Sequence, residues 1–201
     1  MEQELTVTQA AHARNSIRKY TDEPISDDTI RELVSVAGLA PSPWNIQPWR
    51  VVAVKDPETK GKLMEAAYGQ PQVGASAVTF VIWTDMAEAI DNVEDTIHPG
   101  MKEREAETAK SIRDHFAGYS ESDFHWWGRA QGYTFMGFLL LAAQSHGYAT
   151  SAMLGFDPEK VKALLGLPEK AQIPAIVAMG RPAEDGFPHY RHGFDRFAKI
   201  V

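Results

Sequence analysis

Two short segments in the first quarter of the chain carry side chains that could bind a cofactor. Arg14-Asn15-Ser16-Ile17-Arg18, the arginine segment (residues 14–18), places two guanidinium groups and a hydroxyl close together, and phosphate binds to such donors. The Pro/Trp turn (residues 41–49) combines two Trp and three Pro with an Asn and a Gln. It presents flat apolar surface beside amide groups, which suits a planar, hydrogen-bonding ring. Together the segments describe a nucleotide-like cofactor, and FMN fits them best.

The order and spacing of four motifs resemble those of the FMN-dependent nitroreductase family. The first two are Arg-x-Ser-x-Arg in the arginine segment and Ala-Pro-Ser-x-x-Asn-x-Gln-Pro-Trp around the Pro/Trp turn. The others are Ser-Ala-Met-Leu-Gly-Phe-Asp-Pro at residues 151–158 and Ile-Pro-Ala-Ile-Val-Ala-Met-Gly-Arg-Pro at residues 173–182. The match runs from about residue 10 to the C-terminus, although residues 86–125 match no pattern of the family.

This resemblance implies a fold and an assembly. The fold is α+β, with a central, mostly antiparallel sheet sandwiched by helices. One domain would span residues 1–201, and two copies would form an intertwined homodimer with two FMN sites at the interface.

In the arginine segment, the resemblance implies that Arg14 and Arg18 meet the FMN phosphate. Asn15 and Ser16 would bond to nearby phosphate or ring atoms, with Ser16 as a turn cap being the alternative. Taken alone, the segment could also be a helix end with cations at its C-terminus, where the helix dipole favours them.

In the Pro/Trp turn, the resemblance implies contacts to the flavin of the neighbouring subunit, made by Pro41, Ser42, Asn45 and Gln47. A rigid corner under a core is the alternative, but buried amides would then need other partners. Trp44 stands where related proteins often carry a small polar residue, and the resemblance implies that this larger side chain would narrow the substrate side of the ring.

The Met-Leu-Gly segment (residues 153–155) resembles the part of the family that lies against the redox-active edge of the flavin. A backbone N–H from Met153, Leu154 or Gly155 can donate to the flavin N5 atom, and Gly permits a close approach. Gln70 is assigned to the pyrimidine end of the ring, with Gln72 as the neighbouring alternative.

The chain end supplies a basic residue to the phosphate in the family. Arg191 is our choice among His189, Arg191 and Arg196. The C-terminal arm (residues 186–201) contains three Phe and is expected to pack on the partner subunit without forming a helix of its own.

Composition narrows the class of protein. The chain has 201 residues, 44% of them hydrophobic, and a net charge of −7, which disfavours nucleic acid and anionic membranes as partners. No Cys is present, so thiolate metal sites and Cys nucleophiles are excluded. The His pairs lack a full zinc ligand set, no Gly-x-Ser-x-Gly elbow occurs, and no glycine-rich dinucleotide fingerprint is found. With no secretion signal or membrane-length apolar run, we expect a cytoplasmic protein with no metal.

Hydrophobic periodicity predicts the main elements. Helices are expected at residues 7–16, from a Ser26 cap to Pro41, at 58–67, at 99–118 as an exposed helix, at 126–147 and after Asp157; strands are expected at 50–54, 77–83 and 173–179. The helix at 126–147 is apolar nearly all round, so it must be buried on several sides, and a subunit interface would bury it.

The function expected from these residues is hydride transfer from NADH or NADPH through FMN to an oxidised acceptor, by ping-pong kinetics. Nitroaromatics or quinones would stack between the flavin and Trp44, Phe124 or Trp126. The alternatives are an FMN-binding or flavin-sensing module without turnover, and a specialised flavin enzyme of the dehalogenating or flavin-destroying kind.

Overall fold

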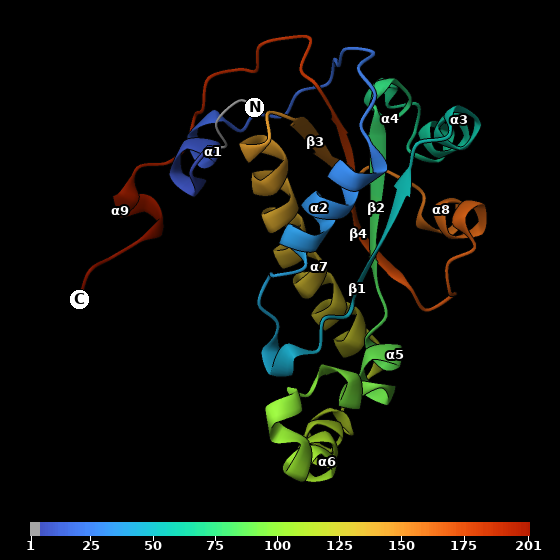
Figure 1. Ribbon diagram of the computed structural model, residues 1–201, viewed down its shortest axis with the longest axis vertical. Helices are drawn as coiled ribbons and strands as arrows, with labels where there is room; N and C mark the ends of the chain where they lie inside the picture. Colours follow the sequence, from blue (N-terminus) through green and yellow to red (C-terminus); the bar gives the residue numbers. More distant parts are fainter. Residues whose placement is uncertain (1–4) are drawn as a thin grey trace.

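A four-stranded antiparallel sheet forms the centre of the computed structural model, which describes residues 5–201 (Figure 1). Its strands are β1 (Trp49–Val54), β2 (Val78–Thr84), β3 (Ala149–Met153) and β4 (Gln172–Gly180), in the order β1-β2-β4-β3. The interior strands β2 and β4 are buried along almost their whole length, as expected for apolar runs covered on both faces. The outer strands β1 and β3 each have one edge that pairs with no other named strand.

Helices surround this sheet, and the sequence between the strands supplies them. They are α1 (Val7–Ala13), α2 (Asp27–Ala37), η1 (Pro43–Asn45), α3 (Pro57–Ala66), α4 (Pro71–Ala75), α5 (Met86–Asp91), η2 (Val93–Thr96), η3 (Pro99–Arg104), α6 (Glu105–Phe116), α7 (Glu121–Ser145), α8 (Pro158–Leu165) and α9 (Phe194–Phe197), where η denotes a 3-10 helix. Among these, no helix is long and apolar enough to span a bilayer.

Both faces of the sheet are covered, which confirms the predicted sandwich. On one face α2 and α7 pack Leu33, Phe135 and Leu139 against Phe80 of β2. On the other face α3, α4 and α8 bury a second apolar cluster against Val81, the next residue of the same strand. Neighbouring residues of a strand point to opposite faces, so β2 contributes to both clusters.

Residues 86–125 contribute most of a third apolar cluster. Two short 3-10 helices precede α6, and α6 buries Ala109, Ile112 and Phe116 on one face. The region predicted as an exposed helix over 99–118 is largely exposed, but its α-helix begins only at Glu105 and has one buried face, because the apolar residues spaced among the charges pack into this cluster.

The long helix α7 begins earlier than predicted. It starts after Ser120, whose side chain accepts from the Asp123 N–H while the Asp123 carboxylate accepts from Ser120, a reciprocal cap. Small residues then bring α7 close to the sheet. A Cβ added to Gly132 would lie 2.5 Å from the Cγ of Pro174 in β4.

The N-terminal helix ends earlier than predicted, and this matters for the site. α1 ends at Ala13, and Arg14 is already extended, with φ −66° and ψ 118°. Ser16 forms an isolated parallel bridge to Thr150 of β3, where the Ile17 N–H donates to the Thr150 carbonyl over 3.1 Å. Pairing with an edge strand, which is invisible in the local sequence, replaces the predicted helix over 14–16.

Two further boundaries differ from expectation. α2 begins after the predicted Ser26 cap but ends at Ala37, so Leu39 lies outside the helix and is 76% exposed. The C-terminal arm includes the short helix α9, although no helix was expected there.

Candidate functional site

The arginine segment lies beside the outer edge of β3. The bridge at Thr150 fixes its backbone, with Arg14 half-buried and Ser16 exposed. The Thr150 hydroxyl is buried and has no hydrogen-bond partner in the described part of the chain. An unpaired buried hydroxyl is costly, so β3 carries a polar group whose hydrogen bonding is incomplete at the residue that bridges to the arginine segment.

Two cations gather at this surface. Partial burial, and secondarily the positive charge of Arg191, lower the pKa of Arg14 from its usual value. Over residues 5–201, no carboxylate forms an ion pair with Arg14. An added anion would stabilise two guanidinium groups that repel each other and have no carboxylate between them. A phosphate dianion has enough oxygen atoms to accept hydrogen bonds from both groups. The choice of Arg191 among the basic residues of the chain end stays a prediction.

The base of the C-terminal arm is attached to the arginine segment. The Arg18 N–H donates to the Glu184 carboxylate over 3.0 Å, and Lys19 lies 3.6 Å from the same carboxylate. The hydrogen bond from Arg18, followed by the charge of Lys19, lowers the pKa of Glu184. At Gly186 an added Cβ would lie 2.5 Å from the Cβ of Asn15, so only Gly fits this crossing.

The Met-Leu-Gly segment continues from the same strand. Met153 ends β3 and is buried, while Leu154 and Gly155 are exposed where the chain leaves the sheet. The Gln70 side chain donates to the Gly155 carbonyl over 2.7 Å. The arginine segment and the Met-Leu-Gly segment are therefore both attached to β3: the first bridges Thr150, and the second, held by Gln70, continues from Met153 at the end of the strand.

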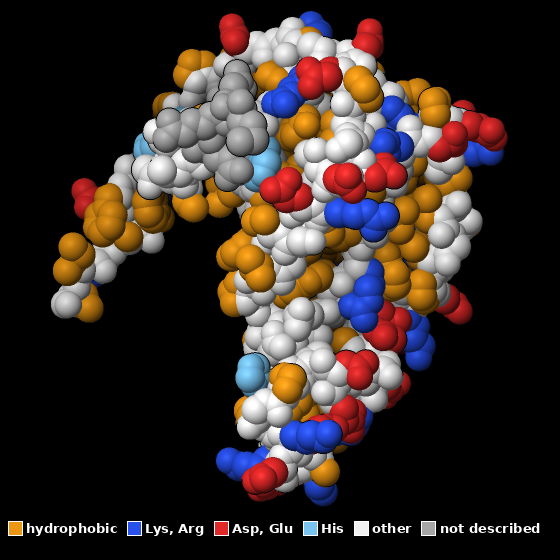
Figure 2. Space-filling model, in the orientation of Figure 1, with side chains coloured by type: hydrophobic (Ala, Val, Ile, Leu, Met, Phe, Trp, Pro, Cys, Tyr) orange, Lys and Arg blue, Asp and Glu red, His pale blue; other side chains and the backbone are white. Residues whose placement is uncertain are grey.

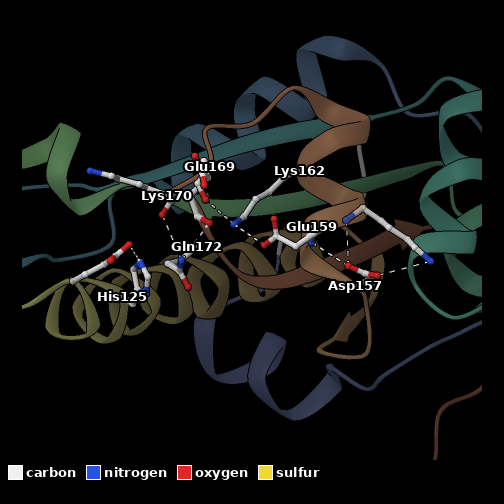
Figure 3. Close-up of polar contacts among 10 residues, drawn as sticks. His125, Asp157, Glu159, Lys162, Glu169, Lys170 and Gln172 are labelled. Carbon is white, nitrogen blue, oxygen red and sulfur yellow. Dashed lines mark hydrogen bonds and ion pairs between the residues drawn. The ribbon is translucent and has the colours of Figure 1, made fainter.

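The chain after Gly155 is held by α8. Figure 3 shows Asp157 capping this helix, where its carboxylate accepts from the N–H groups of Glu159 and Lys160 over 3.1 and 3.2 Å. In the same view Lys162 bonds to the Glu159 carboxylate and to the Glu169 carbonyl, which joins α8 to the loop before β4. The Met-Leu-Gly segment is thus bounded by β3 on one side and by a capped helix on the other.

The Pro/Trp turn stores backbone strain. Trp44, Asn45 and Gln47 have φ values of 51°, 59° and 46°, a left-handed region that residues other than Gly adopt rarely. Hydrogen bonds hold it: the Ser42 hydroxyl accepts from the Gln47 N–H, and the Asn45 amide donates to the Thr96 carbonyl over 2.8 Å. Strain of this kind is retained most often at ligand sites.

Aromatic side chains surround this turn. Trp44 is 44% exposed and lies 4.7 Å from His115 and 6.3 Å from Trp127, measured between ring centroids. Phe124 stacks on Phe116 within the same cluster, at 6.0 Å. Trp126 is 68% exposed and makes none of the ring contacts recorded in residues 5–201. His115, Phe116 and Trp127 were not predicted as part of this cluster, because an aromatic-rich stretch was the only available signal.

Within one chain, the Pro/Trp turn does not meet the other predicted cofactor contacts. In Figure 1 this turn, between α2 and β1, lies beside the lower end of α7, whereas α1 and β3 lie toward its upper end. The Pro/Trp turn and the arginine segment therefore lie in different parts of the chain's structure.

Comparison with known proteins identifies the relationship. The nitroreductase family model matches residues 11–181. The chain belongs to the nitroreductase family. A relative from Thermus thermophilus, named NADH dehydrogenase, is 43% identical over 188 residues, 93% of this chain and 92% of that protein. The CLA biosynthesis enone reductase of Lactiplantibacillus plantarum is 29% identical, covering 86% of this chain and 83% of the relative.

Solved structures of the nitroreductase family confirm the predicted fold. A protein from Exiguobacterium sibiricum assigned as a nitroreductase, crystallised with FMN, is 25% identical with a TM-score of 0.90, covering 100% of this chain and 99% of that one. The predicted family and the predicted nitroreductase-like architecture are therefore both confirmed.

Proposed function

We propose that this member of the nitroreductase family binds FMN and passes a hydride from NADH or NADPH to a small oxidised acceptor. The observation that carries the proposal is the half-buried Arg14, which lies beside the outer strand β3 that leads into the Met-Leu-Gly segment and has no carboxylate partner in residues 5–201. The FMN complex of a relative and the name NADH dehydrogenase of another support this class of enzyme. We also propose a cytoplasmic location, where NADH and NADPH are available.

The residues of this chain bind and orient, whereas bound FMN supplies the redox chemistry. Arg14 and Arg191 would hold the phosphate, with Arg18, Asn15 and Ser16 beside it. Gly155 leaves the main chain open to close approach, because no Cβ stands in the way. Hydride transfer needs positioning more than a general base, so a catalytic acid or base is not required.

The acceptor would contact the aromatic side of the site. Trp44 and Phe124 belong to one cluster with an exposed flat surface, which suits a nitroaromatic or quinone ring. Trp126 projects outward and would reach an acceptor only across a subunit boundary. Donor and acceptor sharing one open face must bind in turn, so we propose ping-pong kinetics.

We propose that the functional unit is a homodimer. Figure 2 shows hydrophobic side chains gathered on the flank of the body that faces the C-terminal arm. An apolar hollow of about 280 Å³ between α1, α2 and α7 is lined by Val36 and Phe138, each 39% exposed. The arm extends away from the body in Figure 1, with Phe187 90% and Phe197 73% exposed. Such surfaces are typical of partner contacts.

Dilution tests the dimer, and flavin absorbance tests the cofactor. Flavin retention and thermal stability should fall together as protein is diluted, because the partner completes each site. A species near 22 kDa by light scattering that retains FMN and turns over would contradict the dimer. Purified protein that retains no flavin absorbance after FMN is added would contradict the proposed function. Tight FMN binding without reduction of the flavin by NADH or NADPH would indicate a binding module instead.

A further inference from the structure

We propose that Gln72 is a positioning residue that acts through Gln70 to fix the main chain at Gly155. The inference rests on the proposed function, which places Gly155 against the redox-active edge of FMN. The relay joins α4 to the Met-Leu-Gly segment through side-chain amides alone.

Gln72 is a buried amide in an otherwise apolar setting. Its side chain is only 5% exposed, and it belongs to the short helix α4 beside the buried Val73. Its amide nitrogen donates to the Gln70 Oε1 atom and to the Met153 sulfur, each over 3.1 Å. Burying an amide is costly unless it is hydrogen-bonded, and an apolar side chain would fill the same volume at lower cost. The amide is therefore better explained by what it orients than by packing.

The orientation that it fixes is that of Gln70. A glutamine side chain can be turned so that its oxygen and nitrogen exchange places. Because Gln72 offers an N–H to Gln70, the Gln70 oxygen must face Gln72. The Gln70 nitrogen then faces the Gly155 carbonyl, to which it donates over 2.7 Å. In the reverse orientation, two carbonyl oxygens would face each other at Gly155.

The Gln70 contact lies between two points where the main chain is held by backbone hydrogen bonds. Met153 pairs with Ile176 of β4, and the Asp157 N–H donates to the Ala66 carbonyl over 2.8 Å. Between these points Leu154 and Gly155 are exposed. In residues 5–201 the Gly155 carbonyl accepts its side-chain hydrogen bond from Gln70. The relay thus adds a hydrogen bond to an exposed stretch of main chain between two anchored points.

A double-mutant cycle on the FMN-loaded protein tests the relay. Gln72→Met and Gln70→Met keep the length of the side chain and remove the amide. Each should change the ratio of affinities for reduced and oxidised FMN about three- to tenfold, the size of one net hydrogen bond. For a two-electron couple this is a shift of about 15–30 mV in the midpoint potential. The double variant should shift by no more than Gln70→Met alone, because Gln72 acts only through Gln70.

Val73→Ala is the matched control, since Val73 is fully buried in the same helix as Gln72, and the substitution opens a cavity while leaving the two amides joined. Its potential should stay within a few millivolts of the unsubstituted protein. Additive shifts from the two Gln substitutions, or an unchanged potential in Gln72→Met, would overturn the proposal. A shift in Val73→Ala as large as that in Gln72→Met would also overturn it, because cavity packing would then account for both.

Hydrogen exchange in the FMN-free protein gives a readout that is independent of activity. The Phe156 amide, which shares a peptide plane with the Gly155 carbonyl, should exchange several-fold faster in Gln72→Met than in Val73→Ala, and equal rates would contradict the relay. If Gln72→Met does not fold, NMR contacts between the side-chain amide protons of the unsubstituted protein and their neighbours decide the question. These contacts must place the Gln70 NH₂ group beside Gly155, and the opposite orientation of the Gln70 amide would refute the inference. Failure of the unsubstituted protein to bind FMN would instead refute the proposed function, while the exchange result would still stand for the relay.

Discussion

Removal of the Arg14 side chain should separate FMN binding from fold stability. Arg14 is half-buried, and in the described chain it has no carboxylate partner to lose. Its pKa is lowered by partial burial and by Arg191, so its charge is held there at some cost. Arg14→Ala should therefore leave the FMN-free protein as stable as before, within about 0.5 kcal/mol.

The effect on FMN should be large by comparison. Charge-assisted hydrogen bonds contribute roughly 1.5–3 kcal/mol each, and the lower part of this range suits a half-exposed group. Arg14→Ala should raise the FMN dissociation constant about 10- to 100-fold. Arg14→Lys should recover little of this loss, because an ammonium group cannot offer the two parallel donors of a guanidinium.

Quenching of flavin fluorescence, titrated against protein, measures this dissociation constant, and thermal unfolding of the FMN-free protein measures the stability. Arg196→Ala is the matched control, since Arg196 lies in α9 on the same arm and is not among the causes of the lowered Arg14 pKa. FMN affinity that is unchanged in Arg14→Ala, or lost equally in Arg196→Ala, would refute the assignment of the phosphate site.

Four further substitutions test the packing, the arm and the acceptor side. Gly132→Ala should destabilise the protein by about 1–3 kcal/mol, because the new Cβ would lie 2.5 Å from Pro174. Gly61→Ala in α3 is the control: the new Cβ has no atom within 4 Å, so the substitution should stabilise the protein by about 0.5–1 kcal/mol. Equal denaturation midpoints for the two variants would contradict this. The pKa of Glu184 is lowered in the folded protein, so its carboxylate stabilises the fold above the ordinary glutamate pKa, and this stabilisation is lost as the pH falls through the folded pKa. The difference in melting temperature between Glu184→Gln and the unsubstituted protein should therefore disappear on acidification. A difference that stays constant with pH would count against this prediction. Trp44→Ala should raise the KM for a quinone acceptor, measured by steady-state kinetics, while FMN affinity, measured by titration, changes less than threefold. An unchanged KM together with a large loss of FMN affinity would remove Trp44 from the acceptor side.

Much of the framework could be predicted because it depends on local patterns. The Ser26 cap and the Asp157 cap with Pro158 gave correct helix starts, and the apolar runs gave β2 and β4. By contrast, β3 is short and lacks strong alternation, and it forms because it pairs with β4. Pairing that depends on distant segments leaves little trace in either segment alone.

The candidate site was predictable in its residue types and less so in its geometry. The arginine segment was expected to end a helix, but its bridge to Thr150 is a contact between residues more than a hundred positions apart. The left-handed backbone at Trp44 and Asn45 could not be anticipated, since neither is Gly. Gln70 and Gln72 looked alike in the sequence, and only the fold shows that one is buried and orients the other.

The most direct test of the central claim is anaerobic stopped-flow mixing of the FMN-loaded protein with NADH and, separately, with NADPH. The account predicts that the oxidised flavin absorbance disappears in a single turnover, with no acceptor present, and returns when a quinone is added in a second mix. It also predicts that the rate of the first step is independent of the acceptor, as ping-pong kinetics require. Flavin that stays oxidised with both donors, while remaining bound to the protein, would contradict the claim that this chain is a hydride-transferring enzyme.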